Sequence, residues 1–448
     1  MLVAVACSGT ADMTADPGPV DPGDGGTDSD GGGEIDVDPQ PTTDYIFDIA
    51  QFHHFELEVD PADWQHLREN ARDEEYVPAT LIFEDERYDY AAVRFKGSYD
   101  SLQSCFDGDV QICPKLSIKV SFNEYVKGRF AGLRKLVFNS AVRDPTFMHE
   151  VVGYWMFREM GIAAPRASHA QLTVNGEPQG VFVLVEQVDK EFVQDRWDRD
   201  QGNLYKEVWP AWDSEQPYID ALRTNREMPD VSDMLALQAL IDETDDDSFA
   251  ADVADILDLS QVARLLAVDQ AIANVDGPSR FYCHDYPDWE TCLNHNFYWY
   301  KENGGELHLI PWDLDRALFD VNRDLGRSMW EDDCQPVPVC EYFNIPGCDP
   351  ATERSAVLPT QCDPLYGLLH RATWDDYLVA LAELANGPLS EDQVTPYVTA
   401  QRDKIRTAVA ADPYGPGLEA FESQNQWLDF ELSNQREEID LLLTEQSP

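Results

Sequence analysis

Basic residues are scarce in this sequence. Of its 448 residues, 32 are lysine or arginine and 85 are aspartate or glutamate, which gives a formal net charge of −53 at pH 7. A surface this negative repels phosphate backbones and anionic membranes, so we expect no nucleic-acid partner. Nine of the basic residues are lysines, and a lysine beside an apolar strand pattern is therefore more informative here than in most chains.

Long hydrophobic runs are missing as well. No stretch of about 18 apolar residues occurs, so we expect no membrane span. The sequence also shows no internal repeat and no G-x-G-x-x-G phosphate loop. Its hydrophobic and aromatic fractions, 43% and 11%, are those of a globular chain that buries a sizeable core in one large domain or two.

The C-x2-C spacing of many zinc sites is absent, although the chain has nine cysteines. Eight of them fall as the neighbouring pairs Cys105/Cys113, Cys283/Cys292, Cys334/Cys340 and Cys348/Cys362. Each pair can close a short loop and the count is even, so we expect disulfides formed in an oxidising compartment. Sequential pairing is the simplest connectivity.

The N-terminal 44 residues differ in composition from the rest. Residues 1–7 contain a short apolar run that ends at Cys7, like the end of a bacterial lipoprotein signal in which this cysteine is lipidated. Residues 8–44 are rich in glycine, proline, aspartate, serine and threonine, which is typical of a flexible, self-repelling tether. We therefore expect an extracytoplasmic protein, either a cell-envelope lipoprotein tethered through Cys7 or a secreted one.

From residue 45 the hydrophobic pattern changes to that of a folded chain. Hairpins are predicted over residues 77–98, over 167–185 with a turn at Asn175–Gly176, and over 295–315 with a turn at 303–305. Helices are predicted over residues 61–71, over 146–161 with Asp144 or Thr146 as cap, over 259–277, and from 372 onward. This order predicts an α+β fold with a β-rich N-terminal part and a mostly helical C-terminal part.

The segment IANVDGPSR places Asn274 and Asp276 at a glycine turn after a predicted helix. A carboxylate held on such a loop can accept a hydroxyl proton as a general base. An asparagine that closes the helix end explains the same pattern. From these residues alone, both interpretations stay open.

The hairpin over residues 295–315 carries candidate metal ligands. If its strands pair, Asn296 at the start of one lies beside Asp313 at the end of the other. Two or three oxygen ligands suffice for Mg²⁺, which keeps water and phosphate oxygens as its other ligands. In an extended conformation Asp315 points the same way as Asp313 and is a further candidate. A strand end carrying solubilising acids is the alternative, but the apolar residues between these acids indicate partial burial.

Several segments follow one another in an order that resembles a known family. They are LRKLVFNSAVRDPTFMHEVVGYWMFREMGIAAPRASHAQLTVNGEPQGVFVLVEQVDKEFV, GNLYKE, NVDG, HNFYWY and IPWDLD. Together they resemble the spore-coat protein H (CotH) kinase family. The resemblance implies an atypical two-lobed protein-kinase-like fold over residues 45–448, with the lobes at about 45–190 and 191–448. It also implies an ATP-dependent kinase that uses Mg²⁺ or Mn²⁺ and acts on serine or threonine of extracytoplasmic proteins.

The same resemblance implies roles for single residues. Asp276 matches the loop aspartate that orients or deprotonates the substrate hydroxyl. Asn296 and Asp313 match the metal ligands, and Asp313 corresponds to the aspartate of the kinase D-F-G element. The implied nucleotide-binding residues are Glu186 and Val188 beside adenine, with Lys115, Lys119 and Lys206 as alternative phosphate contacts.

The chain departs from the family pattern in two inserts, each with a cysteine pair. KGSYDSLQSCFDGDVQICPK stands where the family has a turn like GNSS, and PSRFYCHDYPDWETCL separates Asp276 from Asn296. Glu150 lies on the helix that supplies the kinase Lys–Glu ion pair, but a solvated helix face is the favoured interpretation. The alternatives to a kinase are an inactive surface binding or adhesion module on the same fold, or a nucleotidyl or AMP transferase.

Overall fold

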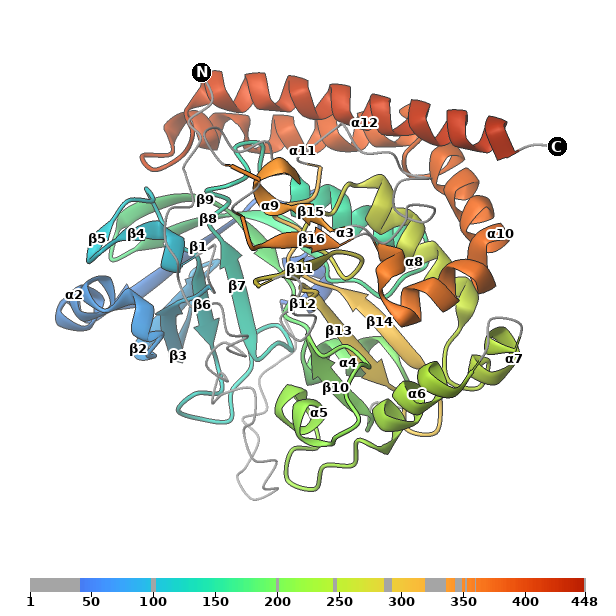
Figure 1. Ribbon diagram of the computed structural model, residues 1–448. Helices are drawn as coiled ribbons and strands as arrows, with labels where there is room; N and C mark the ends of the chain where they lie inside the picture. Colours follow the sequence, from blue (N-terminus) through green and yellow to red (C-terminus); the bar gives the residue numbers. More distant parts are fainter. Residues whose placement is uncertain are drawn as a thin grey trace.

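The computed structural model describes residues 41–97, 102–198, 201–244, 248–285, 292–318, 336–342, 349–350, 353–358 and 360–446. Cys7, residues 8–40 of the expected tether, Cys334 and Cys348 lie outside these ranges. The N-terminal part is rich in strands and the C-terminal part is mostly helical, which confirms the predicted α+β class (Figure 1). Helix α1 (Thr43–Ile46) already begins inside the expected tether.

Seven strands of the N-terminal part close into a barrel in the order β1-β2-β3-β6-β7-β9-β8. Their bounds are β1 His53–Val59, β2 Val77–Phe83, β3 Glu86–Phe95, β6 Ile118–Ser121, β7 Lys135–Asn139, β8 Ala167–Val174 and β9 Glu177–Val185. Neighbouring strands run antiparallel except β1 and β8, which run parallel. Closure leaves the sheet without exposed edges and surrounds a core that contains the rings of Phe55, Phe83 and Phe138.

The hairpins predicted in this part are confirmed. Strands β8 and β9 turn at Asn175 and Gly176, whose φ angles of 50° and 78° are left-handed. Strands β2 and β3 turn at Glu84 and Asp85, with φ angles of 51° and 70°. Two consecutive left-handed residues match the right-handed twist of the flanking strands, which is why such turns suit two-residue hairpins.

Helix α3 (His149–Glu159) joins the barrel to the rest of the molecule, because it contacts β8, β9 and α8 (Leu259–Ala271). It begins three residues later than predicted. The Asp144 carboxylate accepts hydrogen bonds from the Thr146 and His149 N–H groups, each at 2.9 Å, and so fixes the entry to the helix. Both caps expected from the sequence lie at this entry.

A three-stranded antiparallel sheet and a set of helices form the C-terminal part. The strands are β10 Asn203–Lys206, β13 Phe297–Lys301 and β14 Leu307–Pro311. The helices are α4 Lys190–Arg196, α5 Gln216–Ala221, α6 Ser232–Glu243, α7 Phe249–Val253, α10 Pro364–Asn386, α11 Glu391–Ala411 and α12 Leu418–Gln446. Helix α8 packs against α10, and α12 packs against α10 and α11. The hairpin predicted around residues 303–305 is confirmed as β13 and β14.

The remaining helices and strands are small, and those other than α2 lie beside the cysteine pairs. They are α2 Pro61–Glu69, β4 Phe106–Asp107, β5 Val110–Gln111, β11 Phe281–Cys283, β12 Cys292–Leu293, β15 Val337–Pro338, α9 Val339–Tyr342 and β16 Ala356–Leu358. The disulfides Cys105–Cys113 and Cys283–Cys292 are present as predicted. Cys340 and Cys362 are disulfide-bonded as well.

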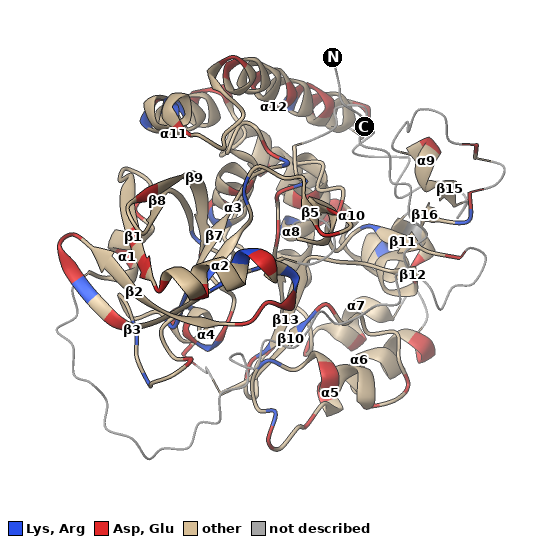
Figure 2. Cartoon of the chain, turned by 90° about the vertical axis from the view of Figure 1, so that its left-hand side faces the viewer, with Lys and Arg blue, Asp and Glu red and all other residues tan. Residues whose placement is uncertain are grey.

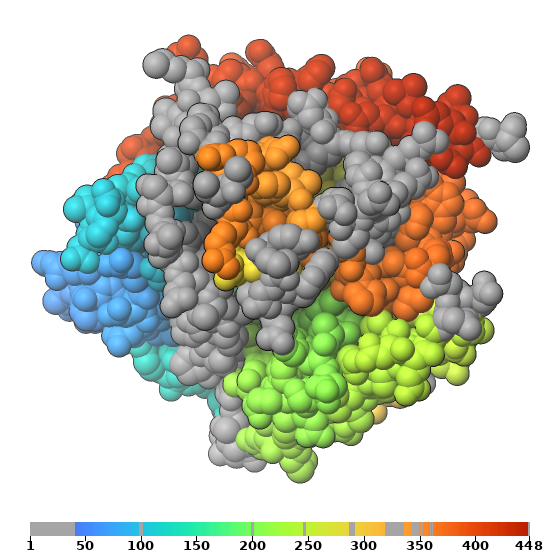
Figure 3. Space-filling view, viewed as in Figure 1, coloured from blue at the N-terminus to red at the C-terminus, as the bar shows by residue number. Residues whose placement is uncertain are grey.

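Helices α11 and α12 form a band along one edge of the molecule. In Figure 3 this band lies above both the barrel and the helices that precede it in the chain. Asp412, at the end of α11, docks this band onto the barrel. Its fully buried carboxylate accepts a hydrogen bond from the Val181 N–H at 2.9 Å and pairs with the Lys115 ammonium at 2.9 Å. A side chain at Gly180, whose φ is +96°, would collide with this carboxylate. The docking contact therefore requires glycine at that position.

Acidic residues occur along α5, α6, α12 and the barrel (Figure 2). Within the described ranges, no helix has the length and apolarity that crossing a membrane requires.

His169 makes the stability of the barrel depend on pH. It is fully buried on β8, and its Nε2 lies 2.8 Å from the Phe147 carbonyl oxygen. Burial lowers the pKa of His169 from 6.5 to about 3, and the Lys404 charge adds to the shift. A pKa lowered by folding means stability that is complete above the unfolded-state value of 6.5 and is lost as the pH falls toward 3.

We expect His169 to lower the free energy of unfolding by on the order of 3 kcal/mol when the pH falls from 7 to 4. The measurement is urea unfolding of the wild type and of His169→Gln at both pH values. At pH 7 the variant should be less stable than the wild type. Its free energy of unfolding should fall less than that of the wild type between pH 7 and pH 4. Equal losses in both proteins would contradict this assignment.

Candidate functional site

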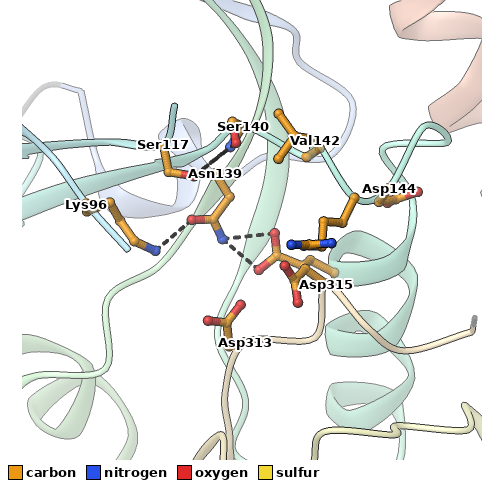
Figure 4. Close-up of a pocket in the computed structure, with 11 residues that line it drawn as sticks. Lys96, Ser117, Asn139, Ser140, Val142, Asp144, Asp313 and Asp315 are labelled. Atoms are coloured by element: carbon orange, nitrogen blue, oxygen red, sulfur yellow. Dashed lines mark hydrogen bonds between the residues drawn. The ribbon is translucent and has the colours of Figure 1, made fainter. Parts of the chain in front are cut away.

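A pocket lies where the barrel meets α3 and the segment after β14 (Figure 4). It is lined by Lys96, Ser117, Asn139, Ser140, Ala141, Val142, Arg143, Asp144, Glu150, Asp313 and Asp315. Two cationic side chains and four carboxyl groups thus share one cavity. Asp313 and Asp315, which the sequence predicts as metal ligands, are among them.

Lys96, Asn139 and Glu150 form a hydrogen-bonded chain across the pocket. Figure 4 labels Lys96 and Asn139 and draws the hydrogen bonds as dashed lines. The Lys96 Nζ donates to Asn139 Oδ1 at 2.8 Å, and Asn139 Nδ2 donates to the two Glu150 carboxylate oxygens at 2.7 and 2.9 Å. Glu150 is 3% exposed, so its interpretation as part of a solvated helix face is wrong. Burial and the Asp313 charge raise the pKa of Glu150 to about 8, although Asn139 and Lys96 act in the opposite direction.

Asp313 and Asp315 reach the pocket, but not through the alternation of an extended strand. Strand β14 ends at Pro311, and Asp313 is left-handed with a φ of 49°. The backbone oxygen of Asp315 lies 3.1 Å from His149 Nδ1, which anchors this segment to α3. Burial raises the pKa of Asp315 well above its ordinary value, and the charges of Asp313 and Glu150 raise it further. Carboxyl groups are therefore crowded at this end of the pocket.

Asn296 links the hairpin to the loop of Asp276. Its Nδ2 donates to the Asp276 backbone oxygen at 2.9 Å and to the Asp276 carboxylate at 3.0 Å. Its backbone oxygen accepts from the Trp312 N–H at 3.0 Å, directly before Asp313. The structure thus places Asn296 between Asp276 and the Asp313 end of the hairpin. Glu207, which the sequence did not suggest, accepts from the Asn296 N–H at 3.0 Å.

The loop that carries Asp276 is wrapped around a buried carboxylate. Asp269 is fully buried and accepts hydrogen bonds from Asn274 Nδ2, at 2.8 Å, and from the Ser279 hydroxyl. A side chain at Gly277 would collide with both Asp269 and Asn274. Helix α8 ends before this loop, and Asn274 binds Asp269 through its side chain. These contacts on both sides of Asp276 hold the loop in one conformation.

The lysines expected to bind phosphate lie in different places. Lys115 is held by Asp412 and by the Val181 backbone oxygen, and neither Lys115 nor Lys119 belongs to the pocket lining. Lys206 lies 3.6 Å from Glu207. Burial lowers the pKa of Lys96 and the charge of Lys206 adds to this shift, so Lys206 approaches the pocket.

The lysine in the pocket is Lys96, which the sequence-based prediction missed. It follows the apolar strand β3 directly, in the segment RFKGS. In a chain with so few lysines, a lysine directly after an apolar strand could have indicated this residue. The alternating pattern around Lys115 and Lys119 favoured those two lysines instead.

Glu186 and Val188, the expected adenine contacts, follow β9. The Glu186 carboxylate pairs with Arg166 and Arg196, each at 2.6 Å. Burial alone would raise the pKa of Glu186, but the two arginines outweigh it and lower the pKa. Val188 is 2% exposed, and its backbone oxygen accepts from Gln187 Nε2 at 3.3 Å. The pocket lining includes neither residue, and their contact with adenine stays a prediction.

The donor set fits a hard divalent cation. Among the described residues, no three carboxylate, imidazole or thiol side chains gather closely enough to hold a metal by themselves. Asp313 and Asp315 offer carboxyl oxygens inside the pocket, and Asn296 offers an amide oxygen directly before β13, outside the pocket lining. Mg²⁺ takes few protein ligands and completes its shell with water and phosphate oxygens, so these three residues would hold such an ion beside a nucleotide.

A family model described as "CotH kinase protein" matches residues 93–436. The chain belongs to the CotH kinase protein family. The family resemblance inferred from the sequence motifs is thereby confirmed, and the protein is kinase-like. The match spans the pocket, the Asp276 loop and the β13–β14 hairpin.

Two CotH relatives come from Bacillus subtilis (strain 168). The inner spore coat protein H is 23% identical over 373 residues, covering 80% of this chain and 88% of that protein. The inner spore coat protein H-like protein is 32% identical over 71 residues, covering 16% of this chain and 22% of that protein. The first match extends over nearly the whole relative, so the CotH similarity is not limited to a short motif.

Two solved structures are distantly similar to the chain. The Helicobacter pylori proinflammatory kinase CtkA is 11% identical, covers 83% of this chain and 95% of its own, and has a TM-score of 0.28. The HipA–HipB–operator DNA complex of Shewanella oneidensis MR-1 gives 12% identity, 76% and 74% coverage, and a TM-score of 0.22. TM-scores this low bear on neither fold nor function.

The Lys115–Asp412 pair predicts a structural role for Lys115. Asp412→Ala leaves a buried ammonium unpaired and should lower the unfolding free energy by about 3–5 kcal/mol. Lys115→Met combined with Asp412→Leu should recover much of that loss, because neither charge is then buried alone. Urea unfolding measures both, with Lys127→Met at an exposed lysine as the control. A cost below about 1 kcal/mol for Asp412→Ala would contradict this role.

Asp269 is expected to be essential for the order of the Asp276 loop. Asp269→Ala leaves the Asn274 amide and the Ser279 hydroxyl buried without their acceptor, which should cost on the order of 3 kcal/mol. Hydrogen exchange of residues 274–280 should accelerate in this variant. Asp258→Ala, which removes the N-cap of α8, is the matched control and should cost about 1 kcal/mol without exposing the loop. Unchanged exchange in Asp269→Ala would refute the role.

Proposed function

We propose that this protein is an exported kinase that transfers the γ-phosphate of ATP to serine or threonine hydroxyls of proteins outside the cytoplasm, using Mg²⁺ or Mn²⁺. One observation carries the proposal: Lys96 and the acidic pair Asp313 and Asp315 line the same pocket. A polyphosphate requires both a cation from the protein and carboxylates that hold a metal. Membership of the CotH family supports the same reaction.

The residues divide into three roles. Lys96 contacts the phosphates, and Lys206 is a second contact from β10. Asn296, Asp313 and Asp315 would hold the metal, which when bound neutralises charge on the phosphates. Glu186 and Val188 follow the strand expected to lie beside adenine.

Asp276 is the proposed general base. Its carboxylate is half-buried and accepts a hydrogen bond from Asn296 at 3.0 Å. It takes the proton of the substrate hydroxyl while the hydroxyl oxygen bonds to the γ-phosphorus and the bond to ADP breaks. The loop contacts of Asp269 keep this carboxylate in place, and positioning of this kind supplies much of the rate enhancement in phosphoryl transfer.

Export is supported by the cysteines. Disulfides such as Cys105–Cys113 and Cys283–Cys292 form in oxidising compartments. They are compatible with an extracytoplasmic protein, as is the similarity to a spore coat protein. A lipid on Cys7 would tether the domain, and cleavage without lipidation would release it.

The test is incubation of the full chain with γ-labelled or α-labelled ATP, Mg²⁺ or Mn²⁺, and a mixture of extracytoplasmic proteins. We expect protein-bound label from γ-labelled ATP alone. In Asp313→Ala this label should fall about a hundredfold or more, because charge stabilisation at the phosphates is lost. Asp440→Ala, at an exposed aspartate of α12, is the control and should keep full activity.

The other outcomes distinguish the alternatives. Label from α-labelled ATP would indicate nucleotidyl transfer at the same site. Absence of label, together with an unfolding temperature that ATP and metal do not change, would contradict both enzymes. A surface binding or adhesion module would then be left.

A further inference from the structure

We propose that Asn139 is a positioning residue that holds the Lys96 ammonium ready for the nucleotide phosphates. This inference rests on the proposed function, because it concerns how the same pocket receives ATP. It starts from the bridge formed by Asn139. In protein kinases the corresponding lysine and glutamate form a direct ion pair, whereas here a neutral amide lies between them.

The amide has one possible orientation. Its oxygen accepts from Lys96 Nζ at 2.8 Å, and its nitrogen donates to both Glu150 oxygens at 2.7 and 2.9 Å (Figure 4). Turning the amide over would place its N–H groups against the Lys96 ammonium, which offers donors and no acceptor. Asn139 is 8% exposed, so water does not readily replace either partner. The ammonium therefore sets the orientation of the amide.

The neutral bridge keeps the charge of Lys96 available. A direct carboxylate contact would pair the ammonium with an opposite charge, and a phosphate would have to compete for it. The amide oxygen takes one of the three ammonium donors and carries no net charge. Glu150 lies behind the amide and is 3% exposed, while Lys96 is half-buried and lines the pocket with Asp313. The arrangement holds the lysine without neutralising it by contact.

The backbone at Asn139 is fixed by a second set of contacts. The Ser140 N–H donates to Ser117 Oγ at 3.0 Å, and the two serine hydroxyls lie 3.2 Å apart. Asn139 itself ends β7 and pairs with Val183 of β9. Lys96 follows β3 and Glu150 lies in the first turn of α3, so the bridge joins three elements.

A charge-preserving exchange tests the bridge. The first variant is Asn139→Asp, whose carboxylate accepts from Lys96 but has no N–H to donate to Glu150. The second is Glu150→Gln, which replaces one of the two oxygens that accept from Asn139 Nδ2 by an N–H donor. In the double variant the new carboxylate accepts both from Lys96 and from the new glutamine amide, so the same three positions are linked again. Titration calorimetry of the full chain with ATP and Mg²⁺ gives the affinities.

We expect each single variant to weaken ATP binding about tenfold or more. The double variant restores the links between the three positions but leaves a carboxylate on Lys96 with which the phosphates must compete, so its affinity should stay clearly below that of the wild type. Asn386→Ala is the matched control, because that exposed amide donates only to the Ala382 backbone oxygen on α10, at 2.8 Å. It should leave the affinity unchanged.

A second cycle separates positioning from folding. Asn139→Ala should lower ATP affinity about tenfold when Lys96 is present and have little effect in the Lys96→Ala background. Urea unfolding of every variant verifies that each is folded at the titration temperature. A loss that persists without Lys96, or a double variant that binds ATP as tightly as the wild type, would overturn the role of Asn139 as a neutral bridge and leave the proposed function standing. A wild-type protein that binds no ATP would overturn both.

Discussion

Burying a carboxylate requires a partner, and this chain has 85 acidic residues and 32 basic ones with which to satisfy that requirement. Where an acid enters the interior, it is held by contacts from more than one element, and those contacts join the parts of the molecule. The buried acids and their partners are Glu186 with Arg166 and Arg196, Asp412 with Lys115 and Val181, Glu150 with Asn139, and Asp269 with Asn274 and Ser279. Three of these pairings rely wholly or partly on neutral donors, as expected where cations are scarce.

The pocket is the place where this pairing is incomplete. Asp313 and Asp315 lie together beside Glu150, and the pKa of Asp315 rises because these charges add to the effect of burial. A protein that bears this cost at one site gains a strong attraction for cations there. The left-handed backbone of Asp313 and of Asn296, with φ angles of 49° and 61°, marks the same region. Strained residues of this kind persist where the surrounding structure holds them, and they concentrate at functional sites.

Local patterns predicted much of this architecture. Alternation and turn residues predicted the β8–β9 and β13–β14 hairpins, and the pairing of β13 with β14 placed Asn296 beside the Asp313 end. Contacts between distant segments were not predictable in this way. Lys115 has the sequence pattern of a pocket residue, but its partner Asp412 lies 297 positions away. The sequence around Glu150 favours a solvated position, and its burial depends on Asn139 and Lys96, which come from other segments of the chain. The barrel closure through β1 and β8 likewise depends on a pairing that no short segment encodes.

The docking of α11 onto β9 also bears on how the chain acquires its structure. The barrel is complete in sequence by Val185, yet the ammonium of Lys115 stays without its anion until Asp412 has been synthesised. Contacts of such long range are slow to form, because a large loop must close before they contribute. A nascent chain would thus hold an N-terminal barrel whose final stability depends on its last two helices. Shortening the chain at its C-terminal end should therefore weaken the strands at the other end of the sequence.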